Sequence, residues 1–98
     1  MKILLICAAG MSTSLLVNNM KKFAKEGDII EAHPASTLDG IVDKYDVVLV
    51  GPQIRYKYAQ IESVCNAKGK AVGLMDMVAY GQMNGELAMG QAKKLLEK

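Results

Sequence analysis

Four short apolar runs alternate along the chain with longer stretches in which apolar residues recur at helical spacing. The runs fall at residues 3–6, 28–34, 47–50 and 71–74, and each has the length of a β-strand. The stretches between them, and the stretch after the last run, have the spacing of amphipathic helices. Strands that alternate with helices favour a parallel sheet, because each parallel connection needs a crossover. The sequence therefore predicts an α/β fold with the element order βαβαβαβα.

The character of the runs predicts their order in the sheet. Residues 3–6 and 47–50 are apolar without interruption, which indicates strands covered on both faces, whereas residues 28–34 alternate only weakly, as at an edge. With right-handed crossovers, these features favour a four-stranded sheet of order 2-1-3-4 with helices on both faces. The order reverses between the first and third strands, so a site is expected above their carboxyl ends. Residues 7–14 and 51–57 should meet there, beside Asp76.

The helix limits are predicted from start and stop signals. The first helix should cover residues 12–26 and end at Gly27, and the third should end at Gly69. Ser36 or Thr37 is expected to cap a short second helix through residue 42. A helical turn from about residue 76 should precede the final helix. The apolar residues expected on inward faces are Leu16, Met20, Phe23 and Ala24 in the first helix, Ile54, Tyr58, Ile61 and Cys65 in the third, and Leu87, Ala88, Ala92, Leu95 and Leu96 in the last.

Size and composition limit the class of protein. A chain of 98 residues that is 51% hydrophobic is expected to form one domain, residues 1–98. A net charge of +2 is too small for a nucleic-acid binder. The longest uncharged stretch, residues 3–20, is too polar to span a membrane, and the N-terminus resembles a signal peptide only weakly. Two cysteines and one histidine make neither a disulfide framework nor a zinc site. We therefore expect a cytoplasmic protein without a metal.

Cys7 ends the first predicted strand and is followed by a loop suited to a tetrahedral dianion. The loop consists mainly of small and hydroxyl-bearing residues, so successive backbone N–H groups can point inward as a nest. The next helix adds unpaired N–H groups and the positive end of its dipole. The sequence therefore predicts that Cys7 is a nucleophile at a phosphate-binding loop, formed by Ala8, Ala9, Gly10, Met11, Ser12, Thr13 and Ser14.

The ionisation of Cys7 sets a requirement on this loop. A thiol with the ordinary pKa near 8.5 is only about 3% ionised at pH 7, so half ionisation requires about 2 kcal/mol. A helix dipole supplies only about 0.3–1 kcal/mol. We therefore expect several loop amides to donate to the sulfur, with help from Arg55 or Lys57. The alternative is that Cys7 is a small core residue, since cysteine is often fully buried.

The segment of residues 7–14 resembles the phosphate loop of low-molecular-weight tyrosine phosphatases, which has the pattern Cys-x5-Arg-Ser. Ser14 matches the serine, but Thr13 stands in the arginine position, and the chain has only one arginine, Arg55. In the phosphatase loop a guanidinium clamps the equatorial oxygens of a transferring phosphoryl group. Its absence indicates a cysteine that is phosphorylated but poorly hydrolysed, as in a carrier.

The chain also resembles the IIB components of the bacterial phosphoenolpyruvate:sugar phosphotransferase system, in the lactose/cellobiose/chitobiose family. The resemblance covers nearly the whole chain and is carried by residues 3–14 (ILLICAAGMSTS) and 46–56 (DVVLVGPQIRY). It implies a fold similar to that of the low-molecular-weight phosphatases. It also implies that Cys7 accepts a phosphoryl group from a phosphohistidine of the IIA component. The acceptor would be a sugar bound by the membrane-embedded IIC component, and no metal or organic cofactor is implied.

The resemblance leaves the sugar and part of the surface open. A β-glucoside disaccharide of the cellobiose type is expected, with lactose and diacetylchitobiose as alternatives, because specificity should lie mainly in IIC. A cytoplasmic monomer that meets the membrane through IIC is expected. Met11 lies either on an adaptable docking rim or inside the fold.

Two other functions stay open at this point. A low-molecular-weight phosphatase or arsenate reductase would use the same fold and cysteine, although the missing loop arginine argues against both. A regulatory IIB-like module would bind partners without transferring phosphate, although such modules are usually fused to transcription regulators.

Several residues outside the loop are candidates for the site. Gln53 could donate to a phosphoryl oxygen, and Arg55, followed by Tyr56, could contact the phosphate or an acidic partner surface. Alternatively, all three are solvated residues at a helix N-terminus. Asp76 follows the fourth strand, where a phosphatase keeps its general acid, but it is expected to cap the next helix. Tyr80 either leans over the site or packs in the core.

The remaining reactive side chains are expected to be structural. Cys65 should be buried and inert, and His33 should lie at a strand end remote from the site. Lys21, Lys22 and Lys25 should be solvated near the negative end of the first helix.

Overall fold

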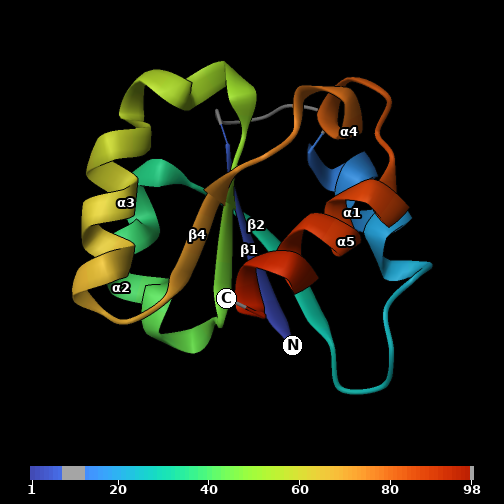
Figure 1. Cartoon of the computed structure of the whole chain (residues 1–98), viewed down its shortest axis with the longest axis horizontal. Helices are drawn as coiled ribbons and strands as arrows, with labels where there is room; N and C mark the ends of the chain where they lie inside the picture. The colour runs from blue at the N-terminus through green and yellow to red at the C-terminus, as the bar shows by residue number, and fades with distance from the viewer. Residues whose placement is uncertain (8–12, 98) are drawn as a thin grey trace.

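The computed structural model describes residues 1–7 and 13–97, and within these residues a parallel four-stranded sheet runs through the middle of the molecule (Figure 1). Its order is β2-β1-β3-β4, as predicted. The two uninterrupted apolar runs occupy the two central positions. The strands are β1 (Lys2–Cys7), β2 (Ile29–Pro34), β3 (Val47–Val50) and β4 (Ala71–Leu74).

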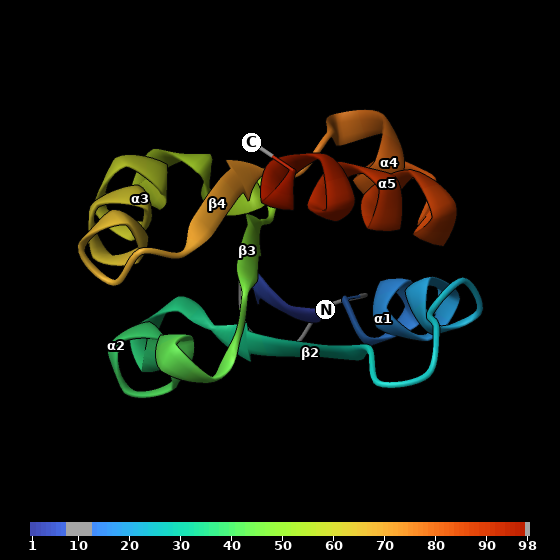
Figure 2. The same cartoon turned by 60° about the horizontal axis from the view of Figure 1, so that its bottom comes forward.

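Helices cover both faces of the sheet. α2 and α3 lie on one side, and α1, α4 and α5 lie on the other (Figure 2). The α-helices within the described residues are α1 (Thr13–Lys21), α2 (Leu38–Ile41), α3 (Tyr58–Ala67), α4 (Met77–Gly81) and α5 (Gly85–Leu96). Short 3-10 segments flank α2 and precede α3: η1 (Ala35–Thr37), η2 (Val42–Lys44) and η3 (Pro52–Lys57).

The central strands divide their side chains between two buried clusters. Leu5 and Leu49 belong to the cluster under α1 and α5, whereas Leu4 and Val48 belong to the cluster under α2 and α3. Every residue of β3 is fully buried, because apolar cores cover it on both faces. The two layers therefore hold the sheet rigidly behind the edge where the strands end.

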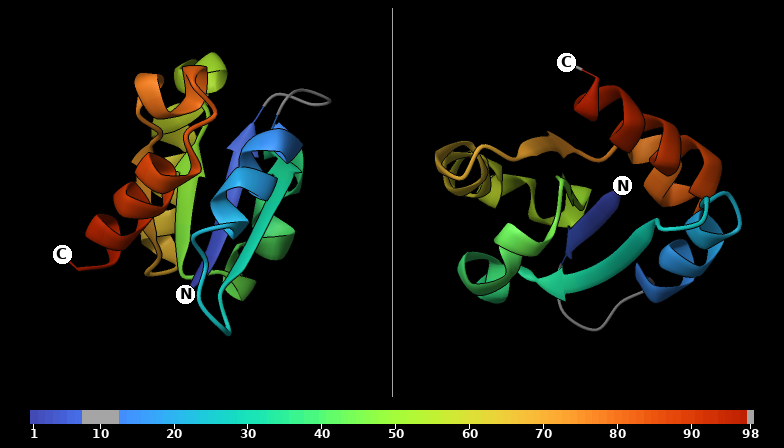
Figure 3. Two further views of the ribbon diagram at one scale, coloured as in Figure 1. Left: turned by 90° about the vertical axis from the view of Figure 1, so that its right-hand side faces the viewer. Right: turned by 90° about the horizontal axis from the view of Figure 1, so that it is seen from below.

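The parallel register brings all four carboxyl ends to one edge of the sheet. Cys7 pairs with Pro34 of β2, Ile6 pairs with Val50 of β3, and Val50 pairs with Leu74 of β4. The left view of Figure 3 shows this edge at the top, with both chain termini at the opposite end. We call it the carboxyl edge.

The predicted end of the first helix is wrong, because α1 ends at Lys21 and not at residue 26. The chain leaves it through i→i−3 bonds such as Phe23 N–H to the Met20 carbonyl at 3.0 Å, and Phe23 is half exposed. The Asp28 carboxylate then accepts the Lys25 N–H at 2.9 Å. α1 runs back along β1 and has to reach only the amino-terminal ends of the strands, because β2 begins there.

Two further helix predictions differ from the structure. Thr37 does not cap α2 with its side chain, because its hydroxyl donates back to the Pro34 carbonyl at 2.8 Å. The third predicted helix is divided into η3 and α3, since Ile54 departs from helical backbone angles. Both differences follow from tight turns that the strand ends impose.

The inward face of α5 is also different from the prediction. Ala88 and Ala92 are buried as expected, but Leu87 and Leu96 are 45% and 38% exposed. Gly85 and Met89 take part in the buried face instead. The small residues on this face let α5 approach α1 closely.

Candidate functional site

Backbone hydrogen bonds hold the strand ends together at the carboxyl edge. The Gly51 N–H donates to the Ile6 carbonyl at 2.7 Å, and the Met75 N–H donates to the Val50 carbonyl at 2.8 Å. These bonds continue the sheet by one residue beyond β3 and β4. The chain after β3 therefore starts directly beside the residue that precedes Cys7.

α1 begins at this same edge and runs back along the sheet. Its first residue is Thr13, and Ser14 in its first turn is exposed. The positive end of the α1 dipole therefore lies at the edge where β1 ends. The predicted loop residues Ala8, Ala9, Gly10, Met11 and Ser12 lie outside the described residues, as do the side chains of Cys7 and Thr13, and their roles stay predictions.

Gln53 and Tyr80 meet across the carboxyl edge. The Gln53 side-chain amide donates to the Tyr80 hydroxyl, which joins η3 to α4. The ring of Tyr80 packs in the cluster under α1 and α5, and its side chain is only 9% exposed. Gln53 was predicted beside the loop, and Tyr80 was expected either to lean over the site or to pack in the core; the hydrogen bond between them was not predicted.

Arg55 and Tyr56, the other two residues predicted beside the loop, are exposed, as Gln53 is. Tyr56 is 76% exposed, and the Lys57 ammonium lies 5.9 Å from the centre of its ring. Arg55 is exposed and forms no ion pair within the described part of the chain. The structure thus places Arg55 and Tyr56 on the surface of η3, while Gln53 turns toward α4.

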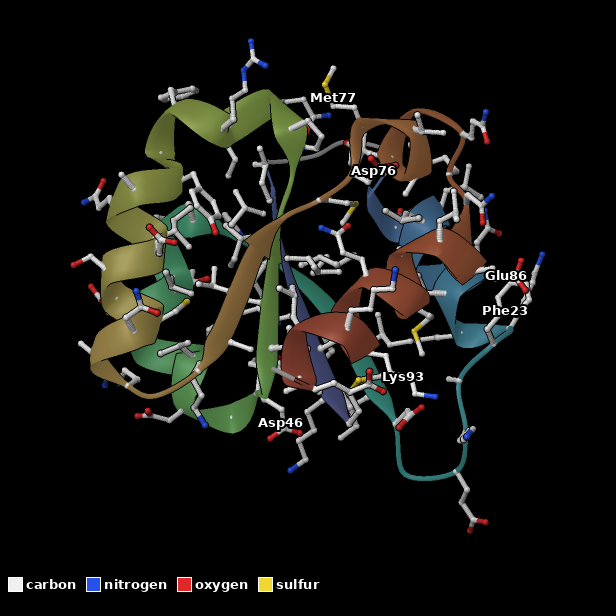
Figure 4. All side chains as sticks on the ribbon, in the orientation of Figure 1. Phe23, Asp46, Asp76, Met77, Glu86 and Lys93 are labelled. Carbon is white, nitrogen blue, oxygen red and sulfur yellow. The ribbon has the colours of Figure 1, made fainter. Side chains whose placement is uncertain are left out.

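Asp76 caps α4, as predicted. Its carboxylate accepts the Ala79 N–H at 3.1 Å, and Figure 4 places it just below Met77 at the top of the molecule. Met77 is 65% exposed. A residue that the sequence analysis missed, Gln91 of α5, holds this turn: its amide donates to the Leu74 carbonyl at 2.6 Å and accepts the Asp76 N–H at 2.8 Å.

Sequence reasoning had no signal for Gln91, because a single glutamine on a helix is usually solvated and its partners are 15 and 17 residues away. The same holds for Asn19 of α1, which donates to the Met83 carbonyl at 2.8 Å. Together with Tyr80, these residues attach α4 and the turns before and after it to η3, α5 and α1. The position of α4 at the carboxyl edge is therefore set by three separate hydrogen-bonding side chains.

His33 is not remote from the site, and that prediction is wrong. β2 is parallel to β1, so His33 lies opposite Ile6 and one residue before the partner of Cys7. Its ring centre lies 6.5 Å from that of Tyr45, and its Nε2 atom lies 3.9 Å from the Glu31 carboxylate. These contacts place it on the face covered by α2.

Cys65 is fully buried in the cluster under α2 and α3, as predicted. Burial raises the pKa of its thiol to about 11, because the apolar surroundings disfavour a thiolate. Cys65 is therefore a neutral thiol at pH 7. The two cysteines lie in different places, one in the core and one at the end of β1.

A metal site and a membrane-spanning helix are both absent from the described residues. These residues contain no group of three or more His, Cys, Asp or Glu side chains placed to hold a metal ion. They also contain no helix with the length and apolar character needed to cross a bilayer.

Comparison with known proteins identifies the family. The family of lactose/cellobiose-specific IIB subunits of the phosphotransferase system matches residues 2–91. The oligo-beta-mannoside-specific EIIB component of Bacillus subtilis is 38% identical, over 97% of this chain and 95% of its own length. The galactose-specific EIIB component of Lactococcus lactis subsp. cremoris is 36% identical, over 96% of this chain and 94% of its own length.

Solved structures agree with this match. The cellobiose-specific phosphotransferase IIB component of Borrelia burgdorferi has 39% identity and a TM-score of 0.81, over 99% of this chain and 92% of its own. The lactose-specific IIB component of Streptococcus pneumoniae shares the fold at 18% identity, with a TM-score of 0.78 over 99% and 95% of the two chains. The chain therefore belongs to the lactose/cellobiose-specific IIB family, whose members are phosphotransferases of the sugar-transporting phosphotransferase system.

Proposed function

We propose that Cys7 carries a phosphoryl group from a phosphohistidine of a IIA component to a sugar bound by a membrane IIC component. The observation that carries this proposal is the position of Cys7 as the last residue of β1, at the edge where α1 begins. A nucleophile there can meet the N–H groups of the intervening loop and of the helix N-terminus. Both stabilise a thiolate and a phosphoryl dianion.

The transfer has two displacements at phosphorus. In the first, the Cys7 thiolate attacks, the S–P bond forms and the N–P bond of the phosphohistidine breaks. The electron pair stays on the imidazole, which takes up a proton. In the second, a sugar hydroxyl oxygen attacks, the O–P bond forms and the thiolate leaves with its electron pair, while the hydroxyl proton passes to solvent or a base. Neither step changes an oxidation state.

The second cysteine is unsuited to this role and provides an internal control. Cys65 is fully buried, and its pKa of about 11 keeps it protonated at neutral pH. Only the thiolate of a cysteine is strongly nucleophilic. A phosphoryl group on this chain is therefore expected on Cys7 alone.

The absent loop arginine favours transfer over hydrolysis. Thr13 stands where the phosphatase loop has its arginine, and the single arginine of the chain, Arg55, is exposed on η3. Without a bidentate guanidinium at the loop, a water attack on phosphocysteine loses a major source of charge stabilisation. The phosphorylated state should then persist until a sugar-loaded partner binds.

For the sugar, we infer a β-linked disaccharide of the cellobiose type. The relatives carry the names of oligo-beta-mannoside, galactose and cellobiose systems at similar identities, and the 39% identical structure is that of a cellobiose-specific component. The protein would then work on the cytoplasmic side of the membrane, where it meets IIC.

Mass spectrometry of phosphorylated variants tests the carrier function. The chain is incubated with phosphoenolpyruvate, the general transfer proteins and a IIA component. The wild type and Cys65→Ala should each gain one phosphoryl group, and Cys7→Ser should gain none. Peptide mapping should place the group on Cys7, with a stability to alkali different from that of phosphohistidine.

Three results would contradict the proposal in different ways. Full phosphorylation of Cys7→Ser would place the acceptor elsewhere. Steady hydrolysis of p-nitrophenyl phosphate that depends on Cys7 would indicate a phosphatase. Tight binding of IIA without phosphorylation would indicate a regulatory module. Transfer from the phosphorylated chain to galactose derivatives but not to cellobiose, in membranes with the matching IIC, would contradict the sugar assignment alone.

A further inference from the structure

The hydrogen bond between Gln53 and Tyr80 leaves donors unused. A glutamine amide has two N–H donors and a tyrosine has one O–H donor, so the pair has three in total. Their mutual bond uses one of them, whichever way the amide is oriented. Within the described part of the chain, neither side chain makes another hydrogen bond. Two donors of the pair are therefore available to a ligand.

Tyr80 holds its end of the pair in the packed layer, and Gln53 reaches it from the exposed surface of η3. Tyr80 packs its ring in the cluster that also contains Leu5 of β1 and Leu16 of α1, the elements on either side of the phosphate loop. The helix that carries Tyr80 is held by the Asp76 cap and by Gln91. A donor on such a support loses little conformational freedom when it binds.

The pair also lies at the carboxyl edge close to the end of β1. Gln53 is two residues after Gly51, whose N–H donates to the Ile6 carbonyl, and η3 contacts β1. Tyr80 reaches the same place from α4, which stands above the end of β4 at the top of Figure 1. The pair thus lies at the carboxyl edge, on segments that adjoin the ends of β1 and β3.

We propose that the Gln53–Tyr80 pair donates its two unused hydrogen bonds to the phosphoryl group during transfer. This proposal rests on the carrier function of Cys7. The pair takes the place of the two parallel N–H donors that an arginine at position 13 would supply. Its donors are neutral, so each bond to a phosphoryl oxygen is weaker than one from a guanidinium. Such donors orient the phosphoryl group and bind it less tightly than a guanidinium would, so that it can still leave for the next partner.

Single-turnover transfer from phosphorylated IIA measures the contribution of each donor. Tyr80→Phe removes the hydroxyl and keeps the ring in the core, and Gln53→Ala removes the amide. Each should slow phosphorylation of Cys7 about tenfold at saturating IIA, because one hydrogen bond to a charged group is lost. The IIA concentration at half-maximal rate should not change. The double variant should be slower than either single variant, because both donors to the phosphoryl group are then absent.

Matched controls separate this role from a structural one. Tyr45→Phe removes a buried hydroxyl on the other face of the sheet, where Tyr45 donates to Glu31. Gln60→Ala removes an exposed amide from α3. Both control variants should transfer at the wild-type rate. Phosphorylation of the wild type should also shift the side-chain amide resonance of Gln53 and leave that of Gln60 in place.

The outcomes distinguish this inference from the carrier function. Wild-type transfer rates in Tyr80→Phe and Gln53→Ala would overturn the role of the pair and leave Cys7 as the carrier. A change confined to the half-saturating IIA concentration would also overturn it, since it would indicate partner docking. A wild-type chain that takes up no phosphoryl group would contradict the carrier function itself.

Discussion

Gly85, the first residue of α5, lies so close to Asn19 of α1 that a β-carbon on it would stand 2.3 Å from the Asn19 carbonyl carbon and oxygen. These are backbone atoms and cannot move aside as a side-chain end can. The same contact region includes the Asn19 side chain, which donates to the Met83 carbonyl. The crossing of α1 and α5 therefore depends on a residue without a side chain.

Gly85→Ala should destabilise the protein by about 3 kcal/mol or more, because overpacking against backbone forces the two helices apart. Gly90→Ala in the same helix is the matched control. A β-carbon there meets nothing within 4 Å, so the better helix propensity of alanine should stabilise the protein by about 0.5–1 kcal/mol. Urea unfolding measures both free energies. Equal effects of the two substitutions would contradict the close contact.

Gln91→Ala should lower the free energy of unfolding by about 1–3 kcal/mol. The substitution removes the bonds to the Leu74 carbonyl and the Asp76 N–H, which close the turn between β4 and α4. Gln60→Ala, on the exposed surface of α3, should change it by less than about 0.5 kcal/mol. Thermal unfolding of the three proteins compares them. If Gln91→Ala is as stable as Gln60→Ala, the turn does not depend on these bonds.

The thiol of Cys65 should resist modification in the folded protein. In a Cys7→Ser variant it is the only cysteine, and at pH 8 it should not react with Ellman's reagent until urea unfolds the chain. Its pKa is raised to about 11 in the fold, so its contribution to stability is complete below about pH 9 and is lost as the pH rises to 11. Rapid reaction of one thiol per chain without urea would show that Cys65 is accessible in the folded protein.

Tyr45 should ionise later than an ordinary tyrosine. Burial, and then the hydrogen bond to the Glu31 carboxylate, raise its pKa from 10.0 to about 12. Because the fold favours the protonated form, the stability from this group is complete below pH 10 and is lost between pH 10 and 12. Burial also raises the pKa of Tyr58, so absorbance of tyrosinate followed with pH should show a late step that Tyr45→Phe reduces and does not abolish. A late step of unchanged size in Tyr45→Phe would assign it to another tyrosine.

The sheet was predictable because each strand has its own local pattern of apolar residues in the sequence. Val47–Val50 is apolar at every position, and such a run is stable only between two covered faces. The edge position of β2 follows from its mixed pattern, and the strand order follows from right-handed crossovers. Where local signals compete with the sheet, prediction failed: α1 ends at Lys21 because the chain must turn back to start β2, although apolar residues continue the helical spacing to Ala24.

The site was predictable in part for the same reason. Cys7, the loop and α1 are consecutive in the chain, so their order alone indicates an anion-binding turn. Gln53 and Tyr80 are 27 residues apart, and a sequence pattern carries no information about a hydrogen bond over that separation. His33 was misjudged even though the predicted parallel order already brings the end of β2 to the edge where β1 ends; the register then places His33 opposite Ile6.

By itself, the sequence determined the α/β class, the strand order, the family and the cysteine that ends β1, because these depend on local periodicity and on short contiguous motifs. Only the tertiary structure decided that Gln53 meets Tyr80, that Gln91 closes the turn before α4 and that α5 crosses α1 at Gly85. These relationships join elements that are distant in the chain. They exist only after both apolar layers have packed against the sheet and set the distances between its helices.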